Sequence, residues 1–259
     1  MTNTNAVDNQ GNRGSANSPA NQKIPLRTWI GVLASMLGAF MAVLDIQITN
    51  ASLQEIQATL GATLEEGSWI STAYLVAEIV VIPLTGWLSR VFSLRWYLLV
   101  NTALFIFFSI CCAWAWNLNS MIVFRALQGF AGGVLIPTAM AVVLTYLPPS
   151  KQPVGLAAFG LTAVFAPSIG PTLGGWLTEN YSWQYSFYIN IFPGLLMLAG
   201  VWYGIKQERP QLQLLKQGDW LGIISMAIGL GSLQIVLEEG SRKDWFGTTG
   251  WIIYFLEIP

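Results

Sequence analysis

Long runs of apolar residues alternate with short polar segments along most of this 259-residue chain. A run of about 18 to 25 apolar residues, wound as a helix, is long enough to cross a hydrocarbon core of about 30 Å. The chain holds seven such runs and the start of an eighth, approximately at 29–49, 69–88, 97–116, 121–145, 155–177, 187–205, 220–237 and from 251 onward. The pattern therefore predicts an all-α membrane protein.

The composition supports this interpretation and excludes several functions. Hydrophobic residues make up 54% of the chain and charged residues 10%, against about 25% charged in soluble domains. There is no histidine, so the commoner metal sites and His-based catalysis are excluded. Cys111 and Cys112 are neighbours in an apolar run and are interpreted as small apolar side chains. No basic stripe points to nucleic acid as a partner.

The distribution of Lys and Arg predicts the orientation in the membrane. The first 26 residues are rich in Asn, Gly and Ser, lack the features of a signal peptide, and are predicted to be a disordered cytoplasmic tail. With this tail inside, two cations fall in outer connections, Arg242 and Lys243, and nine in inner segments: Arg13, Lys23, Arg27, Arg90, Arg95, Lys151, Lys206, Arg209 and Lys216. The N-terminus is therefore predicted to be cytoplasmic.

The last apolar run, which ends in "WIIYFLEIP", is only partly present. A helix that ended within the bilayer would leave backbone carbonyls unsatisfied in hydrocarbon. We therefore expect the sequence to be the N-terminal part of a longer protein.

Three ionisable residues lie well inside predicted spans: Asp45, Glu78 and Arg125. A charge at the bilayer centre costs at least about 2.5 to 3.5 kcal/mol, so such residues usually face a bundle interior and pair. Asp45 and Arg125 both lie roughly 6 Å below the outer ends of their spans, which makes an ion pair between them possible. Glu78 lies near mid-depth, with no cation at its own level.

These residues are candidates for proton transfer, with a structural alternative for each. Burial without a cation favours the protonated form of a carboxyl group, and a neighbouring Arg favours the ionised form. Glu78 is thus a candidate proton carrier, and Asp45 could gain or lose a proton as Arg125 moves. Alternatively, Asp45 and Arg125 form a fixed pair that joins two helices, and Glu78 hydrogen-bonds a neighbouring helix. Gln128 shares a helix face with Arg125 and could bind either Arg125 or substrate.

Small residues and prolines mark two predicted helices for close packing. Gly129 and Gly133 have a small-xxx-small spacing, which we attribute to packing. In "FAPSIGPTLGG", Gly170 and Gly174 repeat that spacing, with Gly175 beside them. This stretch also contains Pro167 and Pro171, which lie four residues apart and each remove one backbone hydrogen bond. These features predict a bent helix that approaches a partner closely.

The same motifs resemble those of a known family. "FAPSIGPTLGG" resembles the antiporter signature of the major facilitator superfamily, "MIVFRALQGFAGG" its fourth-helix Arg motif, and "LDIQITNASLQEI" the first-helix Asp motif of its fourteen-helix drug/proton antiporter branch, the EmrB/QacA type. The resemblance covers the chain from about Trp29 to its end. It implies a six-helix N-terminal bundle over 27–206, a linker with two inserted helices over 207–259, and an absent C-terminal half.

The resemblance also implies a function and residue roles. It implies export of hydrophobic or amphipathic small molecules across the cytoplasmic (inner) membrane in exchange for protons, with no cofactor besides the proton gradient. It implies proton coupling by Asp45 and Arg125, and bending and packing against the other half by Gly170, Pro171, Gly174 and Gly175. In two-membrane bacteria, similar pumps pair with a periplasmic adaptor and an outer-membrane channel.

One motif departs from the family pattern. The segment "GWLSRVFSLRW" matches the Gly-rich cytoplasmic loop at Gly86, but Arg90 stands where the family carries Asp, and Ser93 where it carries Gly. The acidic residue by which the family's loop contacts neighbouring helices is therefore missing here, whereas Arg90 and Arg95 keep the loop basic. In the first-helix motif, Gln54 replaces a usual Pro.

The sequence leaves two alternatives to transport. The chain could be a non-transporting fragment or inactive gene product that needs its missing half, because alternating access requires two bundles that move against each other. A membrane enzyme is disfavoured by the lack of histidine and of a polar catalytic cluster.

Overall fold

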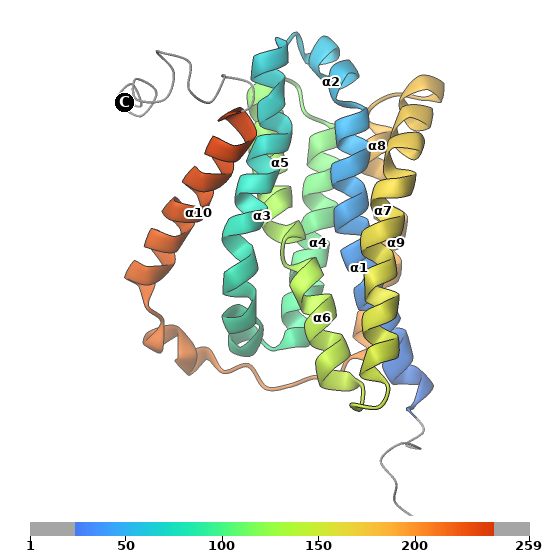
Figure 1. The fold of residues 1–259 in the computed structure, drawn as a ribbon, viewed down its shortest axis with the longest axis vertical. Coiled ribbons are helices and arrows are strands. Elements are labelled where there is room, and N and C mark those ends of the chain that lie inside the picture. The colour runs from blue at the N-terminus through green and yellow to red at the C-terminus, as the bar shows by residue number, and fades with distance from the viewer. Residues whose placement is uncertain (1–23, 241–259) are drawn as a thin grey trace, which may run out of the picture.

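The computed structural model describes residues 24–240, in which every regular element is a helix (Figure 1). The elements are α1 (Leu26–Ala51), α2 (Leu53–Leu60), α3 (Leu64–Phe92), α4 (Leu94–Ala113), α5 (Leu118–Gly132), α6 (Leu135–Tyr146), α7 (Gln152–Asn180), α8 (Tyr185–Tyr188), α9 (Ile191–Gly204), a 3₁₀ helix (Leu212–Gln217) and α10 (Trp220–Gly240). The lower end of the bundle is the end where α1 begins, and the upper end is the one where α1 stops (Figure 1).

Seven helical stretches within the described residues are long and apolar enough to cross a membrane, which confirms the seven complete runs predicted from the sequence. Two of these crossings are interrupted helices: α5 and α6 together form Leu118–Tyr146, and α8 and α9 form Tyr185–Gly204. The eighth predicted run and residues 1–23 of the predicted tail lie outside the described residues. The chain is thus a multi-pass membrane protein, and its predicted fold class is confirmed.

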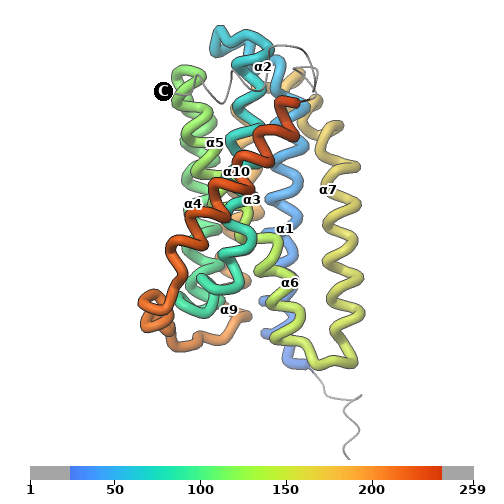
Figure 2. The backbone as a smooth tube through the Cα atoms, turned by 60° about the vertical axis from the view of Figure 1, so that its left-hand side comes forward, coloured from blue at the N-terminus to red at the C-terminus, as the bar shows by residue number. Residues whose placement is uncertain are grey.

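Six of the seven crossings pack against one another as one bundle (Figures 1 and 2). Helix α1 packs against α6, α7 and α9, while α3 packs against α5. The core between them is formed by buried apolar side chains from several helices, among them Val32, Met41, Leu98, Phe105, Leu135 and Met197. Helix α10 lies outside this bundle and packs along α3, which it crosses obliquely in Figure 2.

Capping interactions explain why two helices begin before their apolar runs. At the start of α3, the Thr63 hydroxyl accepts from the Glu66 backbone N–H at 3.2 Å, and the Glu66 carboxylate accepts from the Thr63 N–H at 3.0 Å. Asn117 and Ser120 form a similar reciprocal cap at the start of α5. Each cap satisfies backbone donors that the helix leaves free, so the helix extends beyond its apolar segment.

The glycines of α7 pack against α1 of the same bundle. A Cβ on Gly174 would lie 2.8 Å from the carbonyl oxygen of Ile48, and a Cβ on Gly170 would overlap the side chain of Gln47. The expectation that these two glycines pack against the absent half is therefore wrong, because α1 occupies the side on which each would carry its Cβ. The lack of a side chain is what lets α1 approach this closely. Gly175 has no such neighbour, and Pro171 is exposed. Helix α7 continues through Pro167 and Pro171.

The predicted cytoplasmic loop is mostly helical, which corrects the placement of its motif. Gly86 and Arg90 belong to α3, where Arg90 Nε donates to the Gly86 carbonyl at 3.3 Å, and Arg95 belongs to the first turn of α4. Ser93 alone separates the two helices, with φ 70° and ψ 137°. One residue of positive φ is enough to reverse the chain, so a longer loop is unnecessary. Arg95 is buried, with its guanidinium 4.4 Å from the ring centre of Trp202.

Candidate functional site

Five polar side chains meet inside the upper half of the bundle. Asp45 comes from α1, Ser109 from α4, Arg125 and Gln128 from α5, and Asn190 from the short break between α8 and α9. None of the five is more than 1% exposed. Because an unpaired polar group is costly in such surroundings, the hydrogen bonds among these residues determine what the site can do.

The Asp45 carboxylate accepts three hydrogen bonds. Oδ2 lies 2.6 Å from Arg125 Nη1, so the ion pair that the depths of the two residues made possible is present. Oδ1 accepts from Asn190 Nδ2 at 2.6 Å and from Gln128 Nε2 at 3.1 Å. These donors join α1 to α5 and to the start of α9 through one side chain.

Arg125 is held by further contacts on α3 and α5. Nη1 also donates to Gln128 Oε1 at 2.8 Å, and Nε donates to the backbone carbonyl of Ile70 at 3.4 Å. The guanidinium lies 4.2 Å from the ring centre of Tyr74 and 5.7 Å from that of Phe187. A carboxylate, neutral acceptors and aromatic faces together offset the desolvation of this buried cation.

Gln128 bridges the two members of the ion pair. Its oxygen accepts from Arg125 and its nitrogen donates to Asp45, so the first of its two predicted roles, a ligand to Arg125, is the one that the structure supports. Cys112 Sγ lies 3.5 Å from the same oxygen.

Asn190 and Ser109 were not predicted from the sequence. Asn190 Nδ2 donates to Ser109 Oγ at 3.0 Å, and Ser109 Oγ donates to the carbonyl of Phe187 at 2.9 Å. A signal was nevertheless present, because a polar Asn interrupts the apolar run "FYINIFPG" three residues before Pro193, a common position for a helix start.

Glu78 lies on α3, one helical turn below Tyr74, and is 8% exposed. Among the described residues, no hydrogen bond or ion pair joins its side chain to another group, so the predicted alternative of an interhelical hydrogen bond is not observed. A Cβ on Gly133 would lie 2.9 Å from Glu78 Cα, and one on Gly129 would overlap the carbonyl of Tyr74. These two glycines therefore have the packing role predicted for them.

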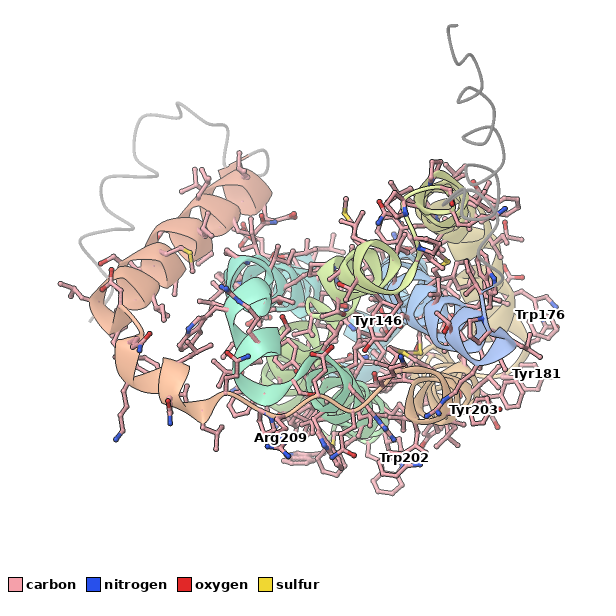
Figure 3. The ribbon with its side chains drawn as sticks, turned by 90° about the horizontal axis from the view of Figure 1, so that it is seen from below. Tyr146, Trp176, Tyr181, Trp202, Tyr203 and Arg209 are labelled. Atoms are coloured by element: carbon pink, nitrogen blue, oxygen red, sulfur yellow. The ribbon has the colours of Figure 1, made fainter. Side chains whose placement is uncertain are left out.

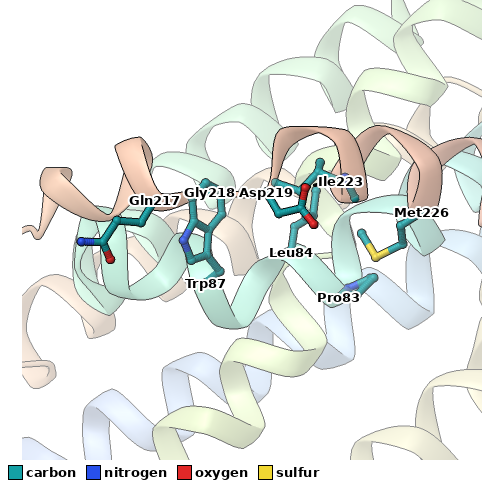
Figure 4. A pocket seen from close by; sticks show the side chains of 9 residues that line it. Pro83, Leu84, Trp87, Gln217, Gly218, Asp219, Ile223 and Met226 are labelled. Atoms are coloured by element: carbon teal, nitrogen blue, oxygen red, sulfur yellow. Dashed lines mark hydrogen bonds between the residues drawn. The ribbon is translucent and has the colours of Figure 1, made fainter.

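The surface features of the bundle lie apart from the five buried polar residues around Asp45. A hollow of about 310 Å³ between α3 and the lower end of α10 is lined by Pro83, Trp87, Asp219 and Met226, among others (Figure 4). The Asp219 carboxylate caps α10 by accepting from the Gly222 N–H at 2.9 Å.

Around the periphery, Trp176, Tyr181 and Trp202 point outward (Figure 3), as side chains at a membrane interface often do. Within residues 24–240 no group of acidic and Cys side chains is suited to a metal ion.

A helical bundle of membrane-crossing length with a buried ion pair in its interior is an architecture found in membrane transporters. The chain matches the Major Facilitator Superfamily over residues 35–256, and it belongs to that family of transporters, not to a family of enzymes.

Several curated relatives carry export or resistance names. The chain is 42% identical to the colistin resistance protein EmrB of Acinetobacter baumannii, over 92% of this chain and 46% of that protein. It is 36% identical to the multidrug export protein EmrB of Haemophilus influenzae, over 85% of this chain and 43% of that protein. For the Escherichia coli K12 protein of the same name the identity is 35%, over 86% and 44%. The chain thus spans less than half the length of these relatives.

Solved transporters share the fold at low sequence identity. A crystal structure of the peptide transporter POT with bound sulfate has a TM-score of 0.61 at 18% identity, covering 87% of this chain and 51% of that chain. The inward open conformation of the xylose transporter XylE from E. coli has a TM-score of 0.58 at 16% identity, covering 85% and 56%. In both, the coverage corresponds to about half of the solved transporter.

Proposed function

We propose that this chain is the N-terminal part of a proton-coupled exporter of hydrophobic or amphipathic small molecules. The observation that carries the proposal is the buried Asp45–Arg125 ion pair at 2.6 Å, in a chain whose relatives include proteins named multidrug export proteins. Because this part of the protein has no histidine, its candidates for proton transfer near neutral pH are carboxyl groups, and Asp45 is the carboxyl that Arg125 contacts.

Protonation of Asp45 would change the forces between helices. In the ionised state, Asp45 and Arg125 neutralise each other and hold α1 against α5. A proton on Asp45 leaves the site with one net positive charge and weakens that tie, so the helices are freer to move. We propose Glu78 as a second proton site, because it is buried on the same helix face as Tyr74 and makes no hydrogen bond within the described residues.

The proposed orientation places the lower end of the bundle in the cytoplasm. Cations gather there, at the ends of α1, α3, α6 and α9 and in the segment before α10. The helix ends on the upper side instead carry Glu55 in α2, Glu65 and Glu66 in α3, and Glu179 in α7. The distribution of Lys and Arg follows the positive-inside rule for an inner-membrane protein with a cytoplasmic N-terminus.

Alternating access would require a second bundle, and assembly with other proteins is a separate proposal. We propose that the exposed side of α7, which includes Pro171, faces the C-terminal half of the longer protein. A periplasmic adaptor and an outer-membrane channel are proposed partners on the basis of family resemblance alone. Co-purification of the full-length protein with an adaptor would test that part.

The test uses the full-length gene product in proteoliposomes, with substrate efflux measured with and without an imposed pH gradient. We expect efflux to need the gradient, and Asp45→Asn to abolish coupled efflux while the protein stays inserted. Asp219→Asn is the matched control, because Asp219 is exposed, lies outside the cluster, and Asn caps a helix as well as Asp does. Equal efflux with and without the gradient would refute coupling, and a full-length frame without a second bundle would favour the non-transporting alternative.

A further inference from the structure

The amide of Asn190 lies between the Asp45 carboxylate and the Ser109 hydroxyl. Its nitrogen is 2.6 Å from Asp45 Oδ1 and 3.0 Å from Ser109 Oγ, so both of its hydrogens are used. The break between α8 and α9 is what brings this side chain to the site, because Asn190 immediately precedes α9.

We propose that Asn190 is a positioning residue for Asp45 that binds both protonation states of this carboxyl group. This inference rests on the proposed proton coupling. In the state observed here, the amide nitrogen donates to the carboxylate. When Asp45 takes up a proton from water, the Asn190 amide turns over, and its oxygen accepts a hydrogen bond from the new carboxylic acid O–H.

Ser109 provides the second half of this exchange. Its hydroxyl now accepts from Asn190 and donates to the Phe187 carbonyl at 2.9 Å. After the amide turns over, the hydroxyl can rotate and donate to the Asn190 oxygen, because a serine hydroxyl both donates and accepts. The turned-over amide oxygen therefore has two donors, and the Phe187 carbonyl, which the hydroxyl leaves, still accepts from the Asn190 backbone N–H at 3.2 Å.

Gln128 cannot make the same exchange. Its oxygen accepts from Arg125 at 2.8 Å while its nitrogen donates to Asp45. Arg125 remains charged in both states, and turning the Gln128 amide would place its NH₂ group against the guanidinium. Asn190 is thus the amide partner of Asp45 that can donate to the ionised carboxylate and accept from the protonated acid.

Several titratable groups surround Asp45 and must be kept constant in any test. They are Arg125 on α5, Tyr74 and Glu78 on α3, and Cys112 on α4. Substitutions at Asn190 and Ser109 leave all four unchanged, so a changed titration reports on the hydrogen bonds to Asp45.

The test is infrared difference spectroscopy of the full-length protein in lipid nanodiscs over a range of pH, with the Asp45 carboxyl band assigned from Asp45→Asn. Hydrogen bonds to a charged acceptor are stronger than those to a neutral group. Asn190→Leu should therefore raise the midpoint of the Asp45 titration by about one pH unit, a tenfold change, and alter the band of the protonated acid. Asn190→Gln, which keeps an amide, should restore most of the wild-type behaviour.

Ser109→Ala is the milder second variant, in case Asn190→Leu does not fold. It leaves Asn190 in place but removes the hydroxyl that would donate to the oxygen of the turned-over amide. The infrared band of protonated Asp45 should therefore change, while the carboxylate band changes little. An unchanged midpoint and an unchanged acid band in the variants would overturn the proposal. If instead the Asp45 band titrates as described but efflux ignores the pH gradient, the proposed function fails and this inference stands.

Discussion

Asp45 and Arg125 show why a buried charge needs a complete set of partners. Each is at most 1% exposed, and together they make hydrogen bonds to Gln128, Asn190 and the Ile70 carbonyl. The pair itself could be predicted from depth along two apolar runs. Asn190 was not predicted, because the Asn three residues before Pro193 signals a helix start but does not show that this amide turns toward α1.

Removal of one member of the pair should destabilise the protein more than removal of both. Arg125→Leu leaves the Asp45 carboxylate buried without its cation, which should cost about 3 to 5 kcal/mol of unfolding free energy. The double variant Asp45→Leu with Arg125→Leu should recover part of this loss. Denaturation in mild detergent measures it, and a double variant whose loss equals the sum of both single losses would contradict the account.

Ser93 has an unfavourable backbone conformation for a residue with a side chain. With φ 70° and ψ 137°, it lies near a region that glycine adopts far more readily, and such strain costs about 1 to 3 kcal/mol. Ser93→Gly should therefore raise the unfolding free energy by about 1 kcal/mol. Ser93→Ala separates the backbone effect from the loss of the buried hydroxyl, and equal stabilisation by both substitutions would argue against strain.

Between helices, the contact of α7 with α1 depends on particular glycines. Gly174→Ala would place a methyl group 2.8 Å from the Ile48 carbonyl oxygen and should cost about 1 to 3 kcal/mol, as overpacking does. Gly175→Ala is the matched control, because a Cβ there meets nothing within 4 Å, and it should be neutral or stabilising by up to about 1 kcal/mol. Stability in detergent measures both, and equal effects would show that the close approach is not decisive.

The helices themselves were predictable because hydrocarbon imposes a minimum length on any crossing. The short helix α2 and the break between α5 and α6 were not predictable, because neither changes the pattern of apolar runs. The eight residues of α2 are too short to cross and lay in a predicted connection, and the break between Gly132 and Leu135 lies in an uninterrupted apolar run. The direction in which Gly170 and Gly174 pack also required the structure, since their spacing indicates a close neighbour but not which helix it is.

For the whole molecule, the proposed orientation can be measured directly. Lys151, at the turn between α6 and α7, and Glu179, near the upper end of α7, are both exposed. Glu179→Cys should react with a membrane-impermeant maleimide in cells whose outer membrane has been made permeable, whereas Lys151→Cys should react only after the inner membrane is opened. The reverse pattern would contradict a cytoplasmic lower end.

At the scale of the whole molecule, the proposed function assigns to Asp45 the proton that drives export. The most direct measurement is proton movement through the full-length protein in proteoliposomes, followed with a pH-sensitive dye when substrate is added. The account predicts substrate-driven proton flux in the wild type and none in a folded, inserted Asp45→Asn variant. Proton flux in the Asp45→Asn variant at the wild-type rate would contradict the account, as would a wild-type protein that exports substrate without any proton flux.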